Sequence, residues 1–173
     1  MLKIHIEPTE MFDELKGEFV TTPDVILKLE HSLLSISKWE SKFEKPFLHS
    51  KKSNEEVLAY IRCMSLTDVF EKYPDLYIPP YALNRINDYI SAKMTATWFR
   101  KSNEAPRREI VTSELIYSWM IAHHIPFECQ KWHLNRLLTL IRVCSEQAKE
   151  KPKMTNEQRR ALNAQRNAQY KKR

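Results

Sequence analysis

Glycine is almost absent from this sequence: Gly17 is the one glycine among 173 residues. Phosphate-binding loops, dinucleotide-binding fingerprints and nucleophile elbows each need several glycines, because the backbone must approach a ligand closely or turn sharply there. None of these motifs can be built from this sequence. The hairpins of large β-sandwiches and barrels also depend on glycine, so the composition favours a mostly helical protein.

Cysteine and long apolar runs are scarce as well. The three cysteines, Cys63, Cys129 and Cys144, stand far apart. An odd number without a short spacing argues against a disulfide framework and is typical of a reducing cytoplasm, so we expect buried free thiols. The sequence has no apolar run of about 18 residues and no signal-peptide core. These absences predict a protein that makes no contact with a membrane and stays where it is synthesised.

The net charge of +6 comes from one end of the chain. Residues 145–173 hold nine Lys or Arg and three Glu, a net charge of +6, so residues 1–144 are neutral overall. The pI near 9.2 therefore describes a neutral globular domain with a cationic tail.

Apolar periodicity predicts a small sheet followed by helices. Alternation of apolar and polar residues predicts three short strands, over 2–7, 18–21 and 25–29. Spacings of three and four then predict helix over much of residues 32–149. The expected fold class is mainly α (α+β), in which a compact domain of residues 1–149 carries a small N-terminal sheet at about residues 2–30.

Start and stop signals place the individual helices. Ser53 and Glu56 form a capping box, and Pro80 is suited to open a helix. The two strongest apolar stripes run over 112–123 and 127–149 and are joined by a short link, so we expect these helices to pack antiparallel at the centre of the domain. A further helix is expected over 32–43, and the apolar stretch 93–99 follows neither a helical nor a strand period.

The last residues, 150–173, differ in composition from the rest of the chain. They contain almost no large apolar residue, so a helix there would be marginal in isolation. We expect a basic tail that is marginally helical or disordered. It has three possible roles: neutralising nucleic-acid phosphates, folding on an acidic protein partner, or keeping the protein soluble. The candidate binding residues in it are Lys151, Lys153, Arg159, Arg160 and Arg166.

Residues that could carry chemistry are present without a recognisable motif. His123, His124, Cys129 and His133 are potential zinc ligands. No pair of them has a tight zinc-binding spacing, and we expect no metal site. The acidic residues near Trp39, which are Glu30, Glu40 and Glu44, are expected to be solvated or in local ion pairs. We therefore predict neither an enzymatic activity nor a cofactor.

An aromatic cluster stands out between residues 38 and 47. Trp39, Phe43 and Phe47 alternate there with lysines. Such a cluster is typical either of the edge of a core or of a groove for a protein partner. All three residues are candidates for partner binding.

Several long stretches together resemble one protein family. They are residues 29–48, 60–65, 94–99, 113–144 and 153–169. They are similar to a group of small proteins encoded in the tail-gene modules of long-tailed bacteriophages, which are described as tail assembly chaperones or tail assembly proteins. The resemblance covers most of residues 25–169 and carries over no catalytic residue.

The resemblance implies a non-enzymatic tail assembly chaperone. Such a protein binds the tape measure protein, the tail tube protein or both, and helps tube subunits polymerise around the long helical tape measure. It works in the host bacterial cytoplasm during infection and is absent from the mature virion. Self-association is a further expectation. The alternatives are a structural virion component of the tail or connector, and a nucleic-acid-binding accessory protein that acts through the basic tail.

Overall fold

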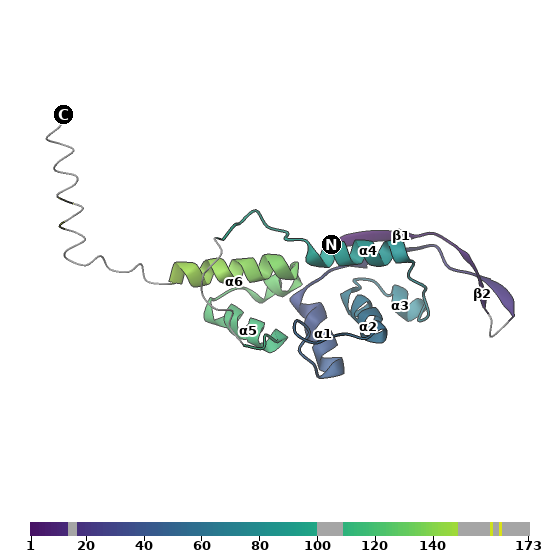
Figure 1. The fold of residues 1–173 in the computed structure, drawn as a ribbon, viewed down its shortest axis with the longest axis horizontal. Coiled ribbons are helices and arrows are strands. Elements are labelled where there is room, and N and C mark those ends of the chain that lie inside the picture. The colour runs from purple at the N-terminus through teal and green to yellow at the C-terminus, as the bar shows by residue number, and fades with distance from the viewer. Residues whose placement is uncertain (14–16, 100–108, 149–159, 161–162, 164–173) are drawn as a thin grey trace, which may run out of the picture. The chain divides into compact units, whose positions relative to one another are not determined.

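The computed structural model describes residues 1–13, 17–99, 109–148, 160 and 163 (Figure 1). The chain divides into two units, Met1–Arg142 and Val143–Arg173. The division lies within the last helix, a few residues before the tail boundary expected from composition. Most of the predicted tail lies outside the described residues.

Two small antiparallel pairs of strands form the N-terminal part. Strand β1 (Leu2–Ile6) pairs with β4 (Val25–Leu29), and β2 (Glu10–Asp13) pairs with β3 (Glu18–Thr21). The predicted small sheet is therefore confirmed, with β2 as a strand that the sequence did not reveal. Every second side chain of β4 is buried, and in β1 Ile4 and Ile6 are buried while Leu2 is half-buried, as the alternation of the sequence predicts.

The first helices begin where the sequence predicts. Helix α1 (Leu33–Phe43) follows Ser32, the first residue of the range expected to be helical, and α2 (Asn54–Met64) starts at the predicted capping box of Ser53 and Glu56. The short α3 (Val69–Lys72) precedes α4 (Pro80–Ser91), which Pro80 opens as predicted.

The predicted helix over residues 127–149 is wrong at its beginning. The chain first forms a 3₁₀-helix, η1 (Phe127–Lys131), and α6 (Leu134–Ala148) begins only later. Between them the backbone is extended, because His133 forms a β-bridge with Ser32 and the N–H of Leu134 donates to the carbonyl of His31. A pairing between residues about 100 positions apart thus overrides the local preference for helix.

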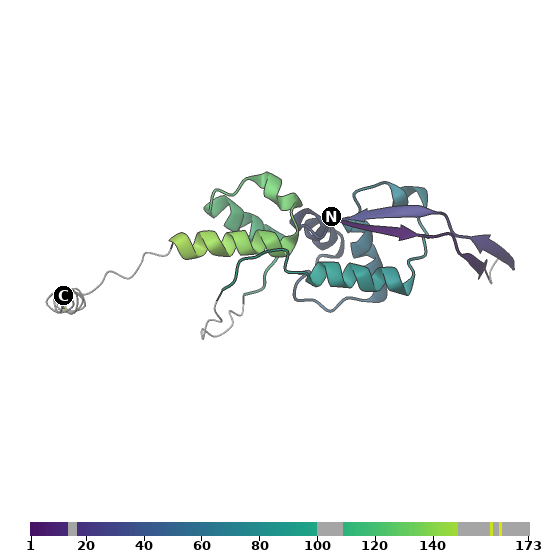
Figure 2. The same ribbon diagram turned by 90° about the horizontal axis from the view of Figure 1, so that it is seen from above.

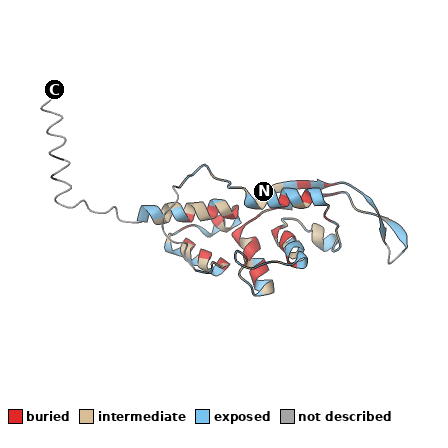
Figure 3. Ribbon diagram, viewed as in Figure 1, coloured by how far each residue is buried: buried red, intermediate tan, exposed pale blue. Residues whose placement is uncertain are grey.

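The core surrounds α1 and not the predicted pair of C-terminal helices. Helix α1 has close contacts with α2, with α5 (Ser113–Ala122) and with η1 (Figures 1 and 2). Most of the buried side chains come from β1, β4 and the longer helices (Figure 3). No helix in the described part of the chain has the length and apolar character needed to cross a membrane.

The first prediction concerns Leu137, which lies in the apolar stripe of α6 and is fully buried. We expect Leu137→Ala to lower the free energy of unfolding by about 2–5 kcal/mol, because it removes buried methyl groups and leaves a cavity. Urea denaturation measures this loss. The control is Leu58→Ala in α2, where the side chain is 41% exposed, and there we expect less than about 1 kcal/mol. Equal losses in the two variants would contradict the burial of the apolar stripe of α6.

Candidate functional site

A groove of about 390 Å³ lies between residues 93–99 and α6. The segment 93–99 follows α4 without regular secondary structure. The amide of Asn135 fixes its start, because its Nδ2 donates to the carbonyls of Ile90 (3.2 Å) and Ala92 (2.8 Å) at the end of α4. The groove is lined by Lys93, Thr95, Thr97, Trp98, Phe99, Asn135, Leu138, Thr139 and Arg142.

Cations lie over aromatic rings in this groove. The Nζ of Lys93 is 4.1 Å from the ring centre of Trp98, and the guanidinium of Arg142 is 3.9 Å from that of Phe99. Trp98 is 80% exposed, and no lining residue is acidic. A surface of this kind is suited to a ligand that presents carboxylates or phosphates beside an apolar group. The irregular apolar stretch 93–99 was its one signal in the sequence.

Helix α5 offers a second candidate surface. Its residues are apolar on most sides, yet only Ser113, Ile116 and Met120 are buried. Ile121 is 60% exposed, and it lies one turn after Tyr117, which is half-buried. The ring of Tyr117 contacts that of Phe127, which is 53% exposed. We call Tyr117, Ile121 and Phe127 the α5 patch. A helix with apolar residues on several sides is normally covered on all of them, so this patch is suited to a protein partner.

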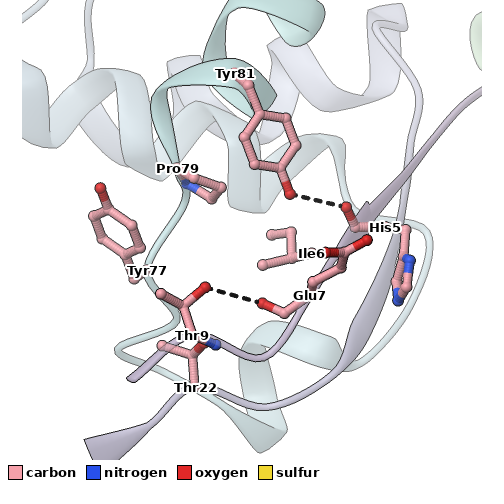
Figure 4. A pocket seen from close by; sticks show the side chains of 8 residues that line it. All are labelled: His5, Ile6, Glu7, Thr9, Thr22, Tyr77, Pro79 and Tyr81. Atoms are coloured by element: carbon pink, nitrogen blue, oxygen red, sulfur yellow. Dashed lines mark hydrogen bonds between the residues drawn. The ribbon is translucent and has the colours of Figure 1, made fainter. Parts of the chain in front are cut away.

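The third candidate is a hollow of about 270 Å³ between the end of β1 and the start of α4 (Figure 4). Tyr77 and Tyr81 stand on either side of Pro79 at its rim. The Tyr81 hydroxyl donates to the carbonyl of His5 (3.1 Å), so it fastens α4 to β1. Since its polar groups bond largely to one another, this hollow is a weaker candidate than the groove.

Two buried histidines, His31 and His133, lie close together where the start of α1 meets the start of α6. The rings of His31 and His133 lie 5.1 Å apart, edge to face. His133 donates from Nε2 to the carbonyl of Tyr89 (2.9 Å), and its Nδ1 accepts from the N–H of Asn135 (3.3 Å). Both ring nitrogens are therefore engaged, which defines the neutral tautomer of His133.

The environment of His31 keeps its ring neutral. Its Nδ1 lies 2.6 Å from the hydroxyl of Tyr60. Burial of the ring is the main cause that lowers the pKa of His31, to about 4, and the nearby His133 is the second cause. Burial also raises the pKa of Tyr60 well above its usual value. The Tyr60 hydroxyl thus joins the start of α1 to α2, while the bond from His133 to Tyr89 joins the start of α6 to α4.

The four potential zinc ligands do not form a site in the described residues. His133 has both ring nitrogens engaged, and Cys129 is buried. His124 is exposed, with its backbone in the left-handed region at φ 53. Among the described residues, no group of three or more His, Cys, Asp or Glu side chains is placed to hold a metal ion.

The expectation that the acidic residues near Trp39 are solvated is wrong for Glu40. This carboxylate is 7% exposed and accepts from the N–H groups of Phe47 and Ser113, both at 2.7 Å. Ser113 is the first residue of α5, where a negative charge is stabilised by the helix dipole. Glu40 therefore acts as a cap supplied from another helix. The carboxylate of Glu30, in contrast, forms an ion pair with the N-terminal ammonium at 2.6 Å.

The predicted binding residues are found in different settings. Trp39 is fully buried and Phe47 nearly so, which places these two aromatic residues in the core of the chain, while Phe43 is half-buried. Trp39 also donates from Nε1 to the carbonyl of Glu56 (2.9 Å). In the tail, Arg160 is helical and exposed. The other four tail candidates, Lys151, Lys153, Arg159 and Arg166, lie outside the described residues.

Comparison with protein-family models, with curated protein sequences and with solved structures finds no match to this chain.

The second prediction concerns acid and His31. An unfolded chain protonates this histidine near pH 6.5, but the folded chain does so only near pH 4. Stability is therefore complete above pH 6.5 and falls as the pH drops towards 4, by roughly 3 kcal/mol from this residue. We expect His31→Gln to remove this part of the pH dependence in denaturation series, and His49→Gln, at an exposed position, to leave it unchanged. An unaltered pH profile in His31→Gln would contradict the assignment.

The third prediction tests the buried carboxylate. Glu40→Ala leaves the N–H groups of Phe47 and Ser113 without their acceptor, so we expect a loss of about 2–5 kcal/mol in the free energy of unfolding. Glu40→Gln keeps an acceptor for one of these N–H groups but turns an NH2 donor towards the other, so we expect a loss that is smaller than in Glu40→Ala but still measurable. Thermal or urea denaturation compares the two variants. A loss below about 0.5 kcal/mol in Glu40→Ala would mean that water replaces the carboxylate.

Proposed function

We propose that this protein is a non-enzymatic tail assembly chaperone of a long-tailed bacteriophage, which binds the tape measure protein, the tail tube protein or both in the host bacterial cytoplasm. The proposal starts from the resemblance of residues 29–48, 60–65, 94–99, 113–144 and 153–169 to that family. A chaperone of this kind must cover an apolar surface on a long helical partner until the tube surrounds it.

The observation that carries the proposal is the α5 patch. It belongs to the longest stretch of the resemblance, residues 113–144, and it leaves Ile121 and Phe127 open to solvent. An exposed apolar patch on a small domain is a common mark of a protein-binding surface. An amphipathic helix of the partner can place its apolar stripe against such a patch.

The other described features fit binding better than chemistry. The buried histidines and tyrosines are engaged with one another and with the backbone, and Glu40 serves as a helix cap. The alternatives remain a structural virion component and a nucleic-acid-binding accessory protein. The basic tail is the feature that favours the latter.

The fourth prediction tests the α5 patch directly. Ile121→Lys places a charge within the α5 patch, and we expect at least about tenfold weaker binding to fragments of the tape measure protein. Calorimetry or fluorescence anisotropy with purified fragments measures the affinity. Ile26→Lys is the matched control, since Ile26 is similarly exposed but lies on β4, and it should bind as the unmodified chain does.

The same samples separate the alternatives. Binding to random-sequence DNA that falls steeply with salt, disappears when residues 151–173 are deleted, and occurs without any binding to tail proteins would favour the nucleic-acid function. Protein in purified virions would favour the structural role. Equal tape measure affinity in Ile121→Lys and Ile26→Lys would remove the α5 patch from the proposal.

A further inference from the structure

The β2–β3 hairpin differs from the groove between residues 93–99 and α6 in the sign of its charge. Residues 7–24, which contain it, include six acidic residues and one lysine, a net charge of −5. Phe12 and Phe19 lie opposite each other in the register, with ring centres 5.2 Å apart. They are 54% and 73% exposed. Glu10 and Glu18 are exposed on the two strands, so the described part of the hairpin presents acidic side chains and an aromatic pair to solvent.

The hairpin also lacks support from the rest of its own chain. In the described residues, β2 and β3 form a sheet of two strands and contact chiefly each other. A two-stranded hairpin is marginally stable in water, and its unpaired edges and exposed aromatic side chains favour association. A surface that covers Phe12 and Phe19 would stabilise it.

The groove offers positive charge and an aromatic surface, which match the acidic and aromatic side chains of the hairpin. It combines two cations, Lys93 and Arg142, with the exposed ring of Trp98, and no acidic residue lines it. Acidic and cationic surfaces attract each other and set the orientation of docking, while aromatic side chains supply the buried area. The two surfaces are thus complementary in charge and alike in aromatic content.

We propose that the β2–β3 hairpin of one copy of this chain docks into the groove between residues 93–99 and α6 of a second copy. In both ribbon views the hairpin and residues 93–99 lie beyond opposite ends of α4 (Figures 1 and 2). A hairpin therefore meets the groove of a neighbour and not its own. The contact joins two different surfaces, so it is heterologous and repeats from copy to copy, which produces rings or open filaments.

This assembly is independent of the α5 patch and of the proposed chaperone function. The α5 patch consists of other residues, so each copy in a row keeps it available for a partner. If the chain is a chaperone, a row of copies offers repeated contacts along one long partner and increases the overall affinity without new kinds of contact.

The fifth prediction is a charge exchange. The unmodified chain should self-associate with rising concentration in sedimentation velocity, less so at high salt. Glu18→Lys in the hairpin and Arg142→Glu in the groove should each weaken the association at least about tenfold. The double variant, which carries both changes, should regain most of it because the exchanged charges again attract. Glu71→Lys, at an exposed position in α3, is the control and should associate normally.

A mixing experiment tests the direction of the contact. Phe19→Ser lacks a hairpin anchor and Trp98→Ser lacks a groove anchor, so each alone should stay monomeric. An equal mixture retains one intact hairpin and one intact groove per pair, and it should form dimers and nothing larger. Circular dichroism of each variant checks that the helical domain is folded.

Several results would overturn this inference. They are a monomeric unmodified chain at all concentrations, unchanged association in Glu18→Lys or Arg142→Glu, no recovery in the double variant, or larger assemblies in the mixture. Tight binding of a thymidine oligonucleotide of about 25 bases that Arg142→Glu abolishes would assign the groove to nucleic acid instead. Loss of self-association in Arg142→Glu with unchanged tape measure binding would leave both proposals standing, whereas tape measure binding without any self-association would refute only this one.

Discussion

The backbone of residues 29–32 is the constraint on which the rest of the first unit depends. Leu29 ends β4 and bridges Ser65 after α2, and the N–H of Glu30 donates to the carbonyl of Met64. The next two residues hold the start of α6 through the bridge at His133. One short segment thus connects the sheet, α2 and α6 by main-chain hydrogen bonds, which side-chain changes on the surface do not disturb. Helix α1 begins directly after it, and this position explains why α1 lies at the centre.

Buried polar groups then fix how the helices meet. The carboxylate of Glu40 holds the first turn of α5, and the histidine and tyrosine hydroxyl between α1 and α2 bond to each other. Each buried polar group has a cost unless it is paired, so these contacts favour one arrangement over other arrangements with equal apolar burial. Histidine, tyrosine and glutamate side chains of this kind can also form a catalytic cluster. In this chain their hydrogen bonds hold the helices together.

The candidate binding surfaces are of two kinds, and both are suited to contacts with other proteins. The α5 patch is apolar and uncharged, which fits the apolar stripe of a helix. The groove and the hairpin are charged with opposite signs and carry exposed aromatic rings, which fits specific docking between copies. If copies dock as we propose, each copy would still present its α5 patch, and the proposed chaperone function requires such repeated contacts along a long partner.

The sequence by itself determined the local structure, because its signals are local. Capping residues, proline positions and apolar alternation predicted β1, β4 and the starts of α1, α2, α4 and α5 correctly. Tertiary structure alone decided what depends on distant partners. It delayed the start of α6, buried Glu40 at a helix end, placed Trp39 in the core, and left Trp98 in solvent. A pattern of neighbours along the chain carries no information on which residues from other elements pair with a polar group or cover an apolar one, and these long-range contacts form the candidate surfaces.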